Sequence, residues 1–301
     1  MPELPEVETV RRMLAGVIPG RRVAHAEVSR KKLRTASLAS LPAALTGRVF
    51  AEPRRTGKFL LLDLERGATL LSHLGMSGRW LFYSKPRRPP ADMLHVHLKL
   101  RFTDGSSLWY QDVRRFGMLR VVPTARLAAD PSLRLLGPDP LAERRDGEQL
   151  RAAADGARAS IKAWLLDQRR IAGVGNIYAS EVLFRTRLHP ARRAGRLTRD
   201  EWARLAHEIP VVLEDSIARM GTTFSTYRTI WNEPGQYGDQ LLVYDRKGEP
   251  CRVCGTPVVR MVQTGRATYL CETCQPRKGS GALPATKVAR ATRAAPKRSA
   301  R

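Results

Sequence analysis

The sequence predicts an α+β protein in which a β-sandwich with a leading helix precedes a helical domain and a small metal-binding ribbon. Three observations predict this fold. Short apolar runs separated by Gly, Pro and Asp fill residues 22–122, the pattern becomes helical after residue 140, and all four cysteines lie within 24 residues near the C-terminus. A chain of 301 residues has room for about two domains, each able to bury a core.

The first predicted element is a helix from about Pro5 to Ala15. Apolar residues recur there at helical spacing, and Gly16 lies near the expected end. Proline suits the first turn of a helix, and the acidic Glu6 and Glu8 interact favourably with the positive end of the helix dipole. The segment therefore carries start and stop signals as well as the right period.

Short β-strands are predicted along residues 22–122, because runs rich in β-branched and large apolar residues alternate there with turn residues. Several short strands at such spacing are typical of a two-layer sandwich. The Pro- and Arg-rich stretch Pro86–Pro90 is predicted to be an exposed loop. The clearest strand candidates are Arg48–Phe50, Phe59–Leu64, Thr69–His73, Val96–Phe102 and Met118–Val122.

The segment Leu136–Pro140 is the predicted domain boundary, because its two prolines and one glycine fit neither neighbour. Beyond it, Ile161–Leu166 and Ile177–Phe184 are predicted helices around the turn Gly173–Asn176. Such a turn can present helix N-terminal amides to a phosphate, although an ordinary connection between helices is the alternative.

A longer helix is predicted to begin at Thr198, since Thr198 and Glu201 have the spacing of a capping box. It is expected to extend to about Met220, with an irregularity at Pro210.

The four cysteines have the spacing of a zinc ribbon. Two Cys-x-x-Cys pairs, Cys251 with Cys254 and Cys271 with Cys274, are separated by sixteen residues that are predicted to form a hairpin. Four thiolates leave no open position on the metal, so we expect one structural Zn²⁺. A redox pair is the alternative, but it would need exposed thiols of low pKa.

The charge indicates a polyanionic partner. The chain has 53 Lys and Arg against 28 Asp and Glu, a net charge of +25. Nucleic acid is the natural candidate. Residues 277–301 hold eight basic residues and no acids, and without them the net charge falls only to +17. Their composition predicts a disordered tail, which serves either as a tether to DNA or simply as a solvated end.

Membrane insertion and secretion are not expected. No apolar run approaches the roughly 18–20 residues of a membrane span, and the acidic N-terminus lacks the positive start of a secretory signal. We expect a soluble cytoplasmic protein, associated with the nucleoid if its partner is DNA.

Residues 2 and 3 place a chain-end amine beside a carboxylate if Met1 is removed, as is expected before a small residue. A chain-end amine has a pKa of about 7.7–8.0, so part of it is unprotonated near neutral pH. Amines attack carbonyl-like carbon and form Schiff bases. Pro2 is therefore a candidate nucleophile and Glu3 a candidate proton-transfer group. The alternative is that both residues only lead into the first helix.

Several separated stretches together resemble bacterial formamidopyrimidine-DNA glycosylases, and the resemblance covers residues 1 to about 275. Six motifs in the same order make a chance match very improbable, although each alone is weak. The stretches are Pro2–Arg12, Gly57–Leu60, His73–Gly78, Asp112–Gly117, Gly173–Glu181 and the cysteine ribbon.

The resemblance implies a bifunctional enzyme of base excision repair. Such an enzyme removes oxidised purines, such as 8-oxoguanine and formamidopyrimidines, from double-stranded DNA, acts at abasic sites, and then cuts the strand. A base inside a duplex is out of reach, so the nucleotide must be flipped out. Similarity assigns Met76, Arg114 and Phe116 to filling the space left behind, a task that suits a thioether, a planar cation and an aromatic ring.

The same resemblance assigns the chemical steps. Pro2 attacks the sugar C1′ and forms a Schiff base, while Glu3 transfers protons that open the sugar ring. Lys58 matches a lysine of β-elimination and phosphate contact, and Arg266 matches an arginine of δ-elimination. Glu6 matches a second acid near the amine.

Other DNA contacts are matched less evenly. Lys162 and Asn176 match phosphate-binding positions of a helix–two-turn–helix motif. Met93 stands where relatives often carry a histidine, which makes His95 a weaker candidate, and Ala157 replaces a basic contact for which Arg158 is the nearby substitute.

The expected organisation follows from these matches. We expect a catalytic sandwich over residues 1–135, a helix–two-turn–helix domain over 141–225, a lesion-recognition loop over 222–240, a zinc finger over 241–276 and the basic tail over 277–301. A monomer is expected. The loop matches relatives poorly beyond Gly221-Thr222-Thr223, so the preferred base is open.

Two alternatives stay open at this point. Endonuclease VIII, of the same superfamily, acts on oxidised pyrimidines, but it typically carries Gly where this chain has Leu4, and Val7 also favours the purine enzyme. A non-catalytic zinc protein that binds damaged DNA would keep the charge and the ribbon, yet it would have no need for Pro2, Glu3 or Lys58.

Overall fold

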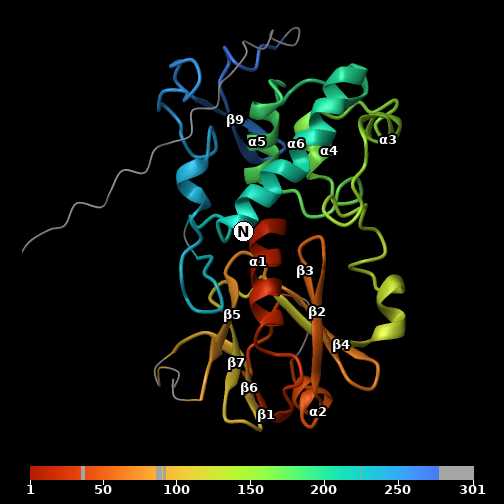
Figure 1. Ribbon diagram of the computed structural model, residues 1–301, viewed down its shortest axis with the longest axis vertical. Helices are drawn as coiled ribbons and strands as arrows, with labels where there is room; N and C mark the ends of the chain where they lie inside the picture. Colours follow the sequence, from red (N-terminus) through yellow and green to blue (C-terminus); the bar gives the residue numbers. More distant parts are fainter. Residues whose placement is uncertain (35–37, 86–89, 91–92, 225, 278–301) are drawn as a thin grey trace, which may run out of the picture.

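The computed structural model describes residues 1–34, 38–85, 90, 93–224 and 226–277. The basic tail from residue 278 onward and most of the predicted 86–90 loop lie outside the described residues. Two β-sheets form one half of the molecule, and helices with a small hairpin form the other (Figure 1). Helix α1, Leu4–Ala15, lies where the halves meet, and its first residues point toward the helical half.

Each sheet has four antiparallel strands, and neighbouring strands are joined in the orders β1-β6-β7-β5 and β2-β3-β4-β8. A short helix, α2, covers Leu41–Leu45. The strands are β1 Val23–Val28, β2 Phe50–Thr56, β3 Phe59–Leu64, β4 Ala68–His73, β5 Gly78–Tyr83, β6 Val96–Phe102, β7 Ser107–Asp112 and β8 Met118–Pro123.

The sheets enclose one apolar core to which α1 contributes a face. Val7, Val10 and Leu14 of α1 are buried in the same cluster as Leu62 of β3 and Leu100 of β6. The helical spacing of the three α1 residues places them on one side, so the helix seals the sandwich. The predicted sandwich with a leading helix is confirmed.

One predicted strand is misplaced. Arg48–Phe50 was expected, but β2 begins at Phe50 and extends to Thr56 through mostly polar residues and Pro53. β2 is an edge strand, where a proline is tolerated and polar side chains reach solvent. Its apolar pattern is therefore too weak to mark its bounds.

The helical half contains α3 Gly147–Ala153, α4 Ile161–Leu166, α5 Asn176–Arg185 and α6 Arg199–Ala218, which share a second core. The predicted capping box is present, since Thr198 Oγ1 accepts the Glu201 N–H and Glu201 accepts the Thr198 N–H. Helix α6 continues through Pro210, so the expected irregularity does not end it. Three short 3₁₀ turns cover Thr124–Ala129, Ala194–Arg196 and Tyr237–Gln240.

Strands β9, Val259–Gln263, and β10, Arg266–Leu270, form the predicted hairpin. Thr264 and Gly265 between them both have positive φ, which is the conformation of a tight type I′ turn. Among the residues that the structure describes, no helix is both long and apolar enough to cross a membrane.

Candidate active site

The start of the chain is held by the glycine turn before α5. The Leu4 N–H donates to the Gly173 carbonyl at 3.1 Å, and the Leu4 side chain is buried in the core of the helical half. A Cβ on Gly173, whose φ is +94°, would overlap Leu4. The glycine turn is therefore a receptor for the N-terminus, a role that its weak motif did not predict.

Glu3 is buried at the N-terminus of α5, with Pro2 buried beside it. Its carboxylate accepts the N–H groups of Ile177 at 3.0 Å and Tyr178 at 3.4 Å. Free N–H groups and the positive end of the helix dipole both favour a carboxylate here. A Cβ on Gly175 would overlap this carboxylate, so only glycine allows the approach.

Glu6 lies one helical turn after Glu3, contacts the Glu3 backbone and is only 1% exposed. Its carboxylate accepts the N–H groups of Glu3 and Thr222, each at 2.8 Å, and the hydroxyl of Tyr178. Burial, and then the charge of Glu3, raise the pKa of Glu6 above its usual range. The acid therefore joins α1, α5 and the segment after α6 in one buried network.

Lys58 belongs to the sandwich and lies near the buried Glu3. It lies in the turn between β2 and β3 and is 7% exposed. Gly57 has a φ of +54° and packs on Ala172, in the segment that receives the N-terminus. Burial lowers the pKa of Lys58, while the charge of Glu3 raises it and that of Arg266 lowers it. The pKa of Lys58 is thus influenced by charges from the N-terminal segment and from the C-terminal hairpin.

Arg266 is exposed at the first position of β10, and the next residue is fixed from the helical half. The Ala267 carbonyl accepts bonds from Asn176 Nδ2 and Lys162 Nζ, each at 2.9 Å. Lys162 Nζ also donates to Thr268 Oγ1 at 2.6 Å. These bonds connect α4 and α5 to the strand that carries Arg266.

Lys162, whose phosphate contact stays a prediction, is buried in this structure. The side chain is only 1% exposed and its amine faces the hairpin. Burial lowers the pKa of Lys162 to about 7, against the opposing effect of Glu3. In this structure Lys162 joins two elements, whereas Asn176 is half-buried with its amide nitrogen also directed at the hairpin.

The three residues predicted to fill the space left by a flipped nucleotide, here called the wedge residues, lie together on two neighbouring turns. Met76 follows β4, whereas Arg114 and Phe116 follow β7. Phe116 is 42% exposed although it is a large apolar residue, and the Arg114 guanidinium lies 4.9 Å from the centre of its ring. His95, with a φ of 60°, and Arg158 are also exposed, and their DNA contacts stay predictions.

Three aromatic or basic side chains at the site were not singled out from the sequence. The Tyr178 hydroxyl donates to the Glu6 carboxylate, and the Tyr244 hydroxyl lies 3.5 Å from Asn176 Nδ2. Burial, together with the charge of Lys58, lowers the pKa of His73 to about 4. Tyr178 and His73 lie within the motifs Gly173–Glu181 and His73–Gly78, and their place in these motifs is the sequence signal for them. Tyr244 has no such signal.

The four cysteine sulfurs all lie within 4.8 Å of one another. Cys251 Sγ and Cys274 Sγ are 3.9 Å apart, and Cys254 Sγ and Cys271 Sγ are 3.4 Å apart. Tetrahedral Zn²⁺ with bonds of about 2.3 Å requires sulfurs about 3.8 Å apart. The residues therefore fit a structural zinc ion.

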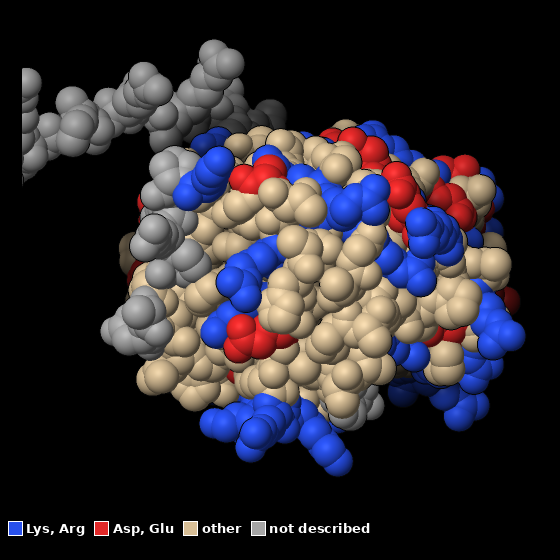
Figure 2. Space-filling view, turned by 90° about the horizontal axis from the view of Figure 1, so that it is seen from below, with Lys and Arg blue, Asp and Glu red and all other residues tan. Residues whose placement is uncertain are grey.

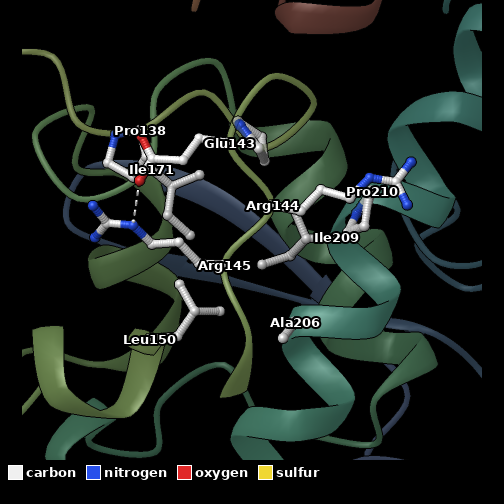
Figure 3. Close-up of a pocket in the computed structure, with 10 residues that line it drawn as sticks. Pro138, Glu143, Arg144, Arg145, Leu150, Ile171, Ala206, Ile209 and Pro210 are labelled. Carbon is white, nitrogen blue, oxygen red and sulfur yellow. Dashed lines mark hydrogen bonds and ion pairs between the residues drawn. The ribbon is translucent and has the colours of Figure 1, made fainter. Parts of the chain in front are cut away.

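The described surface also carries a pocket and groups of charged side chains. The pocket in Figure 3 lies between the boundary segment and α6, lined by residues such as Pro138, Ile171 and Ile209, and none of the predicted site residues lines it. Figure 2 shows Lys and Arg in several separate groups on the sheet end of the molecule, with Asp and Glu in smaller groups among the uncharged residues. Positive charge is therefore present on the sandwich as well as at the site.

Comparison with protein families gives three matches along the chain. The formamidopyrimidine-DNA glycosylase N-terminal domain matches residues 1–119, and the formamidopyrimidine-DNA glycosylase H2TH domain matches residues 136–228. The zinc finger found in FPG and IleRS matches residues 248–277. The three matches follow the order of the sandwich, the helices and the hairpin.

Relatives and solved structures agree. Formamidopyrimidine-DNA glycosylase of Methylococcus capsulatus is 46% identical over 278 residues, covering 91% of this chain and 100% of that protein. That of Cereibacter sphaeroides is 43% identical, with the same coverage. A crystal structure of Lactococcus lactis FPG in complex with a Fapy-dG containing DNA matches with a TM-score of 0.84 at 32% identity, covering 92% of this chain and 100% of that one. MutM (FPG) from Thermus thermophilus has a TM-score of 0.80 at 39% identity, covering 91% and 98%.

The fold, the convergence of both halves on the N-terminus and these matches define a DNA glycosylase of DNA repair. The chain belongs to the formamidopyrimidine-DNA glycosylase family, and the resemblance carried by the sequence motifs is confirmed.

Proposed function

We propose that this protein is a bifunctional DNA glycosylase and abasic-site lyase that removes oxidised purines from double-stranded DNA. One observation carries the proposal. Pro2 is buried beside Glu3, Glu3 is bound by α5 amides, and the charges of both Glu3 and Arg266 act on Lys58. A nucleophile, a proton-transfer group and two cations thus meet where DNA-binding elements of both halves converge.

The chemistry follows from these groups. After removal of Met1, the Pro2 nitrogen attacks the sugar C1′, the bond from C1′ to the base breaks, and the base leaves with a proton. Glu3 transfers the proton that opens the sugar ring, which gives a Schiff base between Pro2 and C1′. The iminium makes the C2′ proton acidic, so its removal expels the 3′ phosphate. A second elimination expels the 5′ phosphate.

The cations have distinct parts in this scheme. Lys58, whose pKa burial lowers, can exchange a proton during β-elimination or contact a phosphate. Arg266 is exposed at the hairpin, where its guanidinium suits a phosphate during δ-elimination. Glu6 supports Glu3 from below by accepting the Glu3 N–H.

The preferred base is inferred from relatives. The similar proteins are named formamidopyrimidine-DNA glycosylases, and one similar structure holds a Fapy-dG containing DNA. Another holds an oxidized pyrimidine containing DNA, which keeps an endonuclease VIII-like preference as the second candidate. The DNA partner of this chain is expected to carry an oxidised base or an abasic site.

Borohydride trapping on abasic DNA tests the chemistry. We expect a covalent adduct with wild-type protein whose Met1 removal is verified. Pro2→Gly should lose most strand cutting while DNA binding largely survives, because Glu3 and Leu4 keep their hydrogen bonds to the helical half. Absence of an adduct with the verified wild type would favour the non-catalytic DNA-binding protein.

Excision from 8-oxoguanine:C and thymine glycol:A duplexes tests the substrate. Faster release of 8-oxoguanine is expected, and a clear preference for thymine glycol would overturn the assignment to purines. Zinc analysis of the same preparation should give one ion per chain.

A further inference from the structure

A buried hydrogen-bonded pair joins the two turns that carry the wedge residues. Asp112, the last residue of β7, is 0% exposed, and Ser77 is 4% exposed. The Ser77 hydroxyl donates to Asp112 Oδ1 at 2.5 Å and accepts the Arg114 N–H at 2.9 Å. Asp112 Oδ2 accepts the Gly117 N–H at 2.7 Å. The pair therefore fixes the backbone on both sides of Phe116 and directly after Met76.

Glycines bring the same turns into contact. A Cβ on Gly75, whose φ is +61°, would overlap the backbone of Phe116. A Cβ on Gly78 or on Gly117 would overlap the Tyr110 hydroxyl, which lies between the turns and donates to the His73 carbonyl at 3.3 Å. The space between the turns is filled, so one turn cannot shift without the other.

We infer that Ser77 and Asp112 are positioning residues that hold Met76, Arg114 and Phe116 as one preformed wedge for displacing a nucleotide from the duplex. The inference rests on the proposed function. None of the described hydrogen bonds of this pair goes to Pro2, Glu3 or Lys58. The pair therefore acts on extrusion of the nucleotide and not on the bonds that break afterwards.

Preformation matters because extrusion is costly. Unstacking and unpairing a base costs a few kcal/mol, and less for a base that is already mismatched or absent. Groups that are ordered before binding avoid the cost of becoming ordered at that moment. Loosening the wedge should therefore slow reactions that need extrusion of a paired base, and should affect an existing abasic site much less.

Ser77→Ala tests this assignment, because it removes the donor to Asp112 and the acceptor for Arg114 together. Excision of a paired lesion should fall about 10- to 100-fold, the effect of leaving a buried carboxylate with an unmade hydrogen bond. Cutting of a preformed abasic site should change by less than about threefold. Ser72→Ala is the matched control, because Ser72 is also 0% exposed and accepts a bond from Trp80 Nε1, and none of its described hydrogen bonds goes to Ser77, Asp112 or the wedge residues. It should leave the ratio of the two rates unchanged.

Two further measurements separate positioning from general damage. Asp112→Asn keeps the shape of the side chain and should shift the same ratio in the same direction. In a Phe116→Ala background the effect of Ser77→Ala should shrink, because little wedge is left to position. An equal loss on both substrates, or the same ratio shift from Ser72→Ala, would overturn the inference. A wild type that cuts neither substrate would instead refute the proposed function.

Discussion

Gly175 shows how one residue sets the position of the Glu3 carboxylate. The carboxylate reaches the first amides of α5 because Gly175 has no side chain in its path. Gly175→Ala should displace Glu3 and reduce strand cutting at abasic sites by at least about tenfold, since misplaced catalytic groups can cost as much as a hundredfold. Gel-based cutting assays under single-turnover conditions measure this.

Gly16→Ala is the control for that substitution. Gly16 ends α1 with a φ of −79°, and an added Cβ would meet only the Met13 carbonyl at an ordinary 3.6 Å. It should cut like the wild type. Unchanged cutting by Gly175→Ala would mean that Glu3 does not need the α5 amides.

Glu3, Glu6 and Lys58 could be named from the sequence as candidate site residues, but not how they meet. Glu3 contacts Ile177 across 174 positions of the chain, and this depends on the docking of two domains. Lys162 shows the limit clearly, because its phosphate contact stays a prediction and nothing in the sequence indicated that its amine would lie buried against β10. A charged residue on a short helix gives no local sign of which partner it will face.

At the scale of elements, an ionic network fastens α1 and β2 to the boundary segment. Glu8 of α1 accepts from Arg55 of β2 at 2.9 Å, and Arg55 also pairs with Asp139. Asp139 in turn accepts the Gly57 N–H at 2.9 Å. The turn that carries Lys58 is therefore fixed from two sides.

Glu8 makes this network sensitive to pH. Burial would raise the pKa of Glu8, but hydrogen bonds from Arg11, Arg12 and Arg55 lower it from 4.5 to about 2. The folded-state pKa lies below the unfolded one, so the stabilisation is complete above about pH 4.5 and is lost as the pH falls toward 2. That difference corresponds to about 3 kcal/mol at most.

Glu8→Gln should therefore lower the free energy of unfolding by about 1–2 kcal/mol at pH 7, less than the full shift because solvent screens the partly exposed Arg11 and Arg12, and the difference from wild type should shrink below pH 4.5. Urea titrations at pH 7, 5 and 3.5 measure it. Glu27→Gln is the control, because Glu27 is exposed and pairs only loosely with Lys99 at 3.5 Å, so it should change stability by less than about 0.5 kcal/mol. A difference for Glu8→Gln that stays constant with pH would contradict the role of its charge.

Elements with strong local signals were predictable. β3, Phe59–Leu64, and β6, Val96–Phe102, are apolar enough to match their predicted bounds, and the capping box located the start of α6. Polar β2 was not predictable in the same way. Its register with β3 shifts between Phe50 and Pro53, and its ion pair with Glu8 comes from a distant part of the chain, which a local pattern cannot contain.

Across the whole molecule, the ribbon is connected to the active site by two routes. Glu181, buried in α5, accepts the N–H groups of residues 242–244, which lead into the ribbon. Ala267 in β10 is held by Lys162 and Asn176. Cys251, Cys271 and Cys274 pack in one small apolar cluster with Phe184 of α5. A structural change at the cysteines should therefore reach Arg266.

Zinc removal tests that connection. A zinc ribbon of this size has little apolar core of its own, so its folding depends on the metal. Chelation, or Cys254→Ser, should release β10 and lower both DNA affinity and strand cutting by at least about tenfold, which is about 1.4 kcal/mol of binding free energy. The sandwich has a separate core and should keep its strands.

DNA titrations measure the affinity, and circular dichroism of the same samples measures the strand content. Added Zn²⁺ should restore DNA binding to the chelated wild type but not to Cys254→Ser. Zinc-free protein that binds and cuts normally would show that the metal-bound ribbon is not needed to position Arg266.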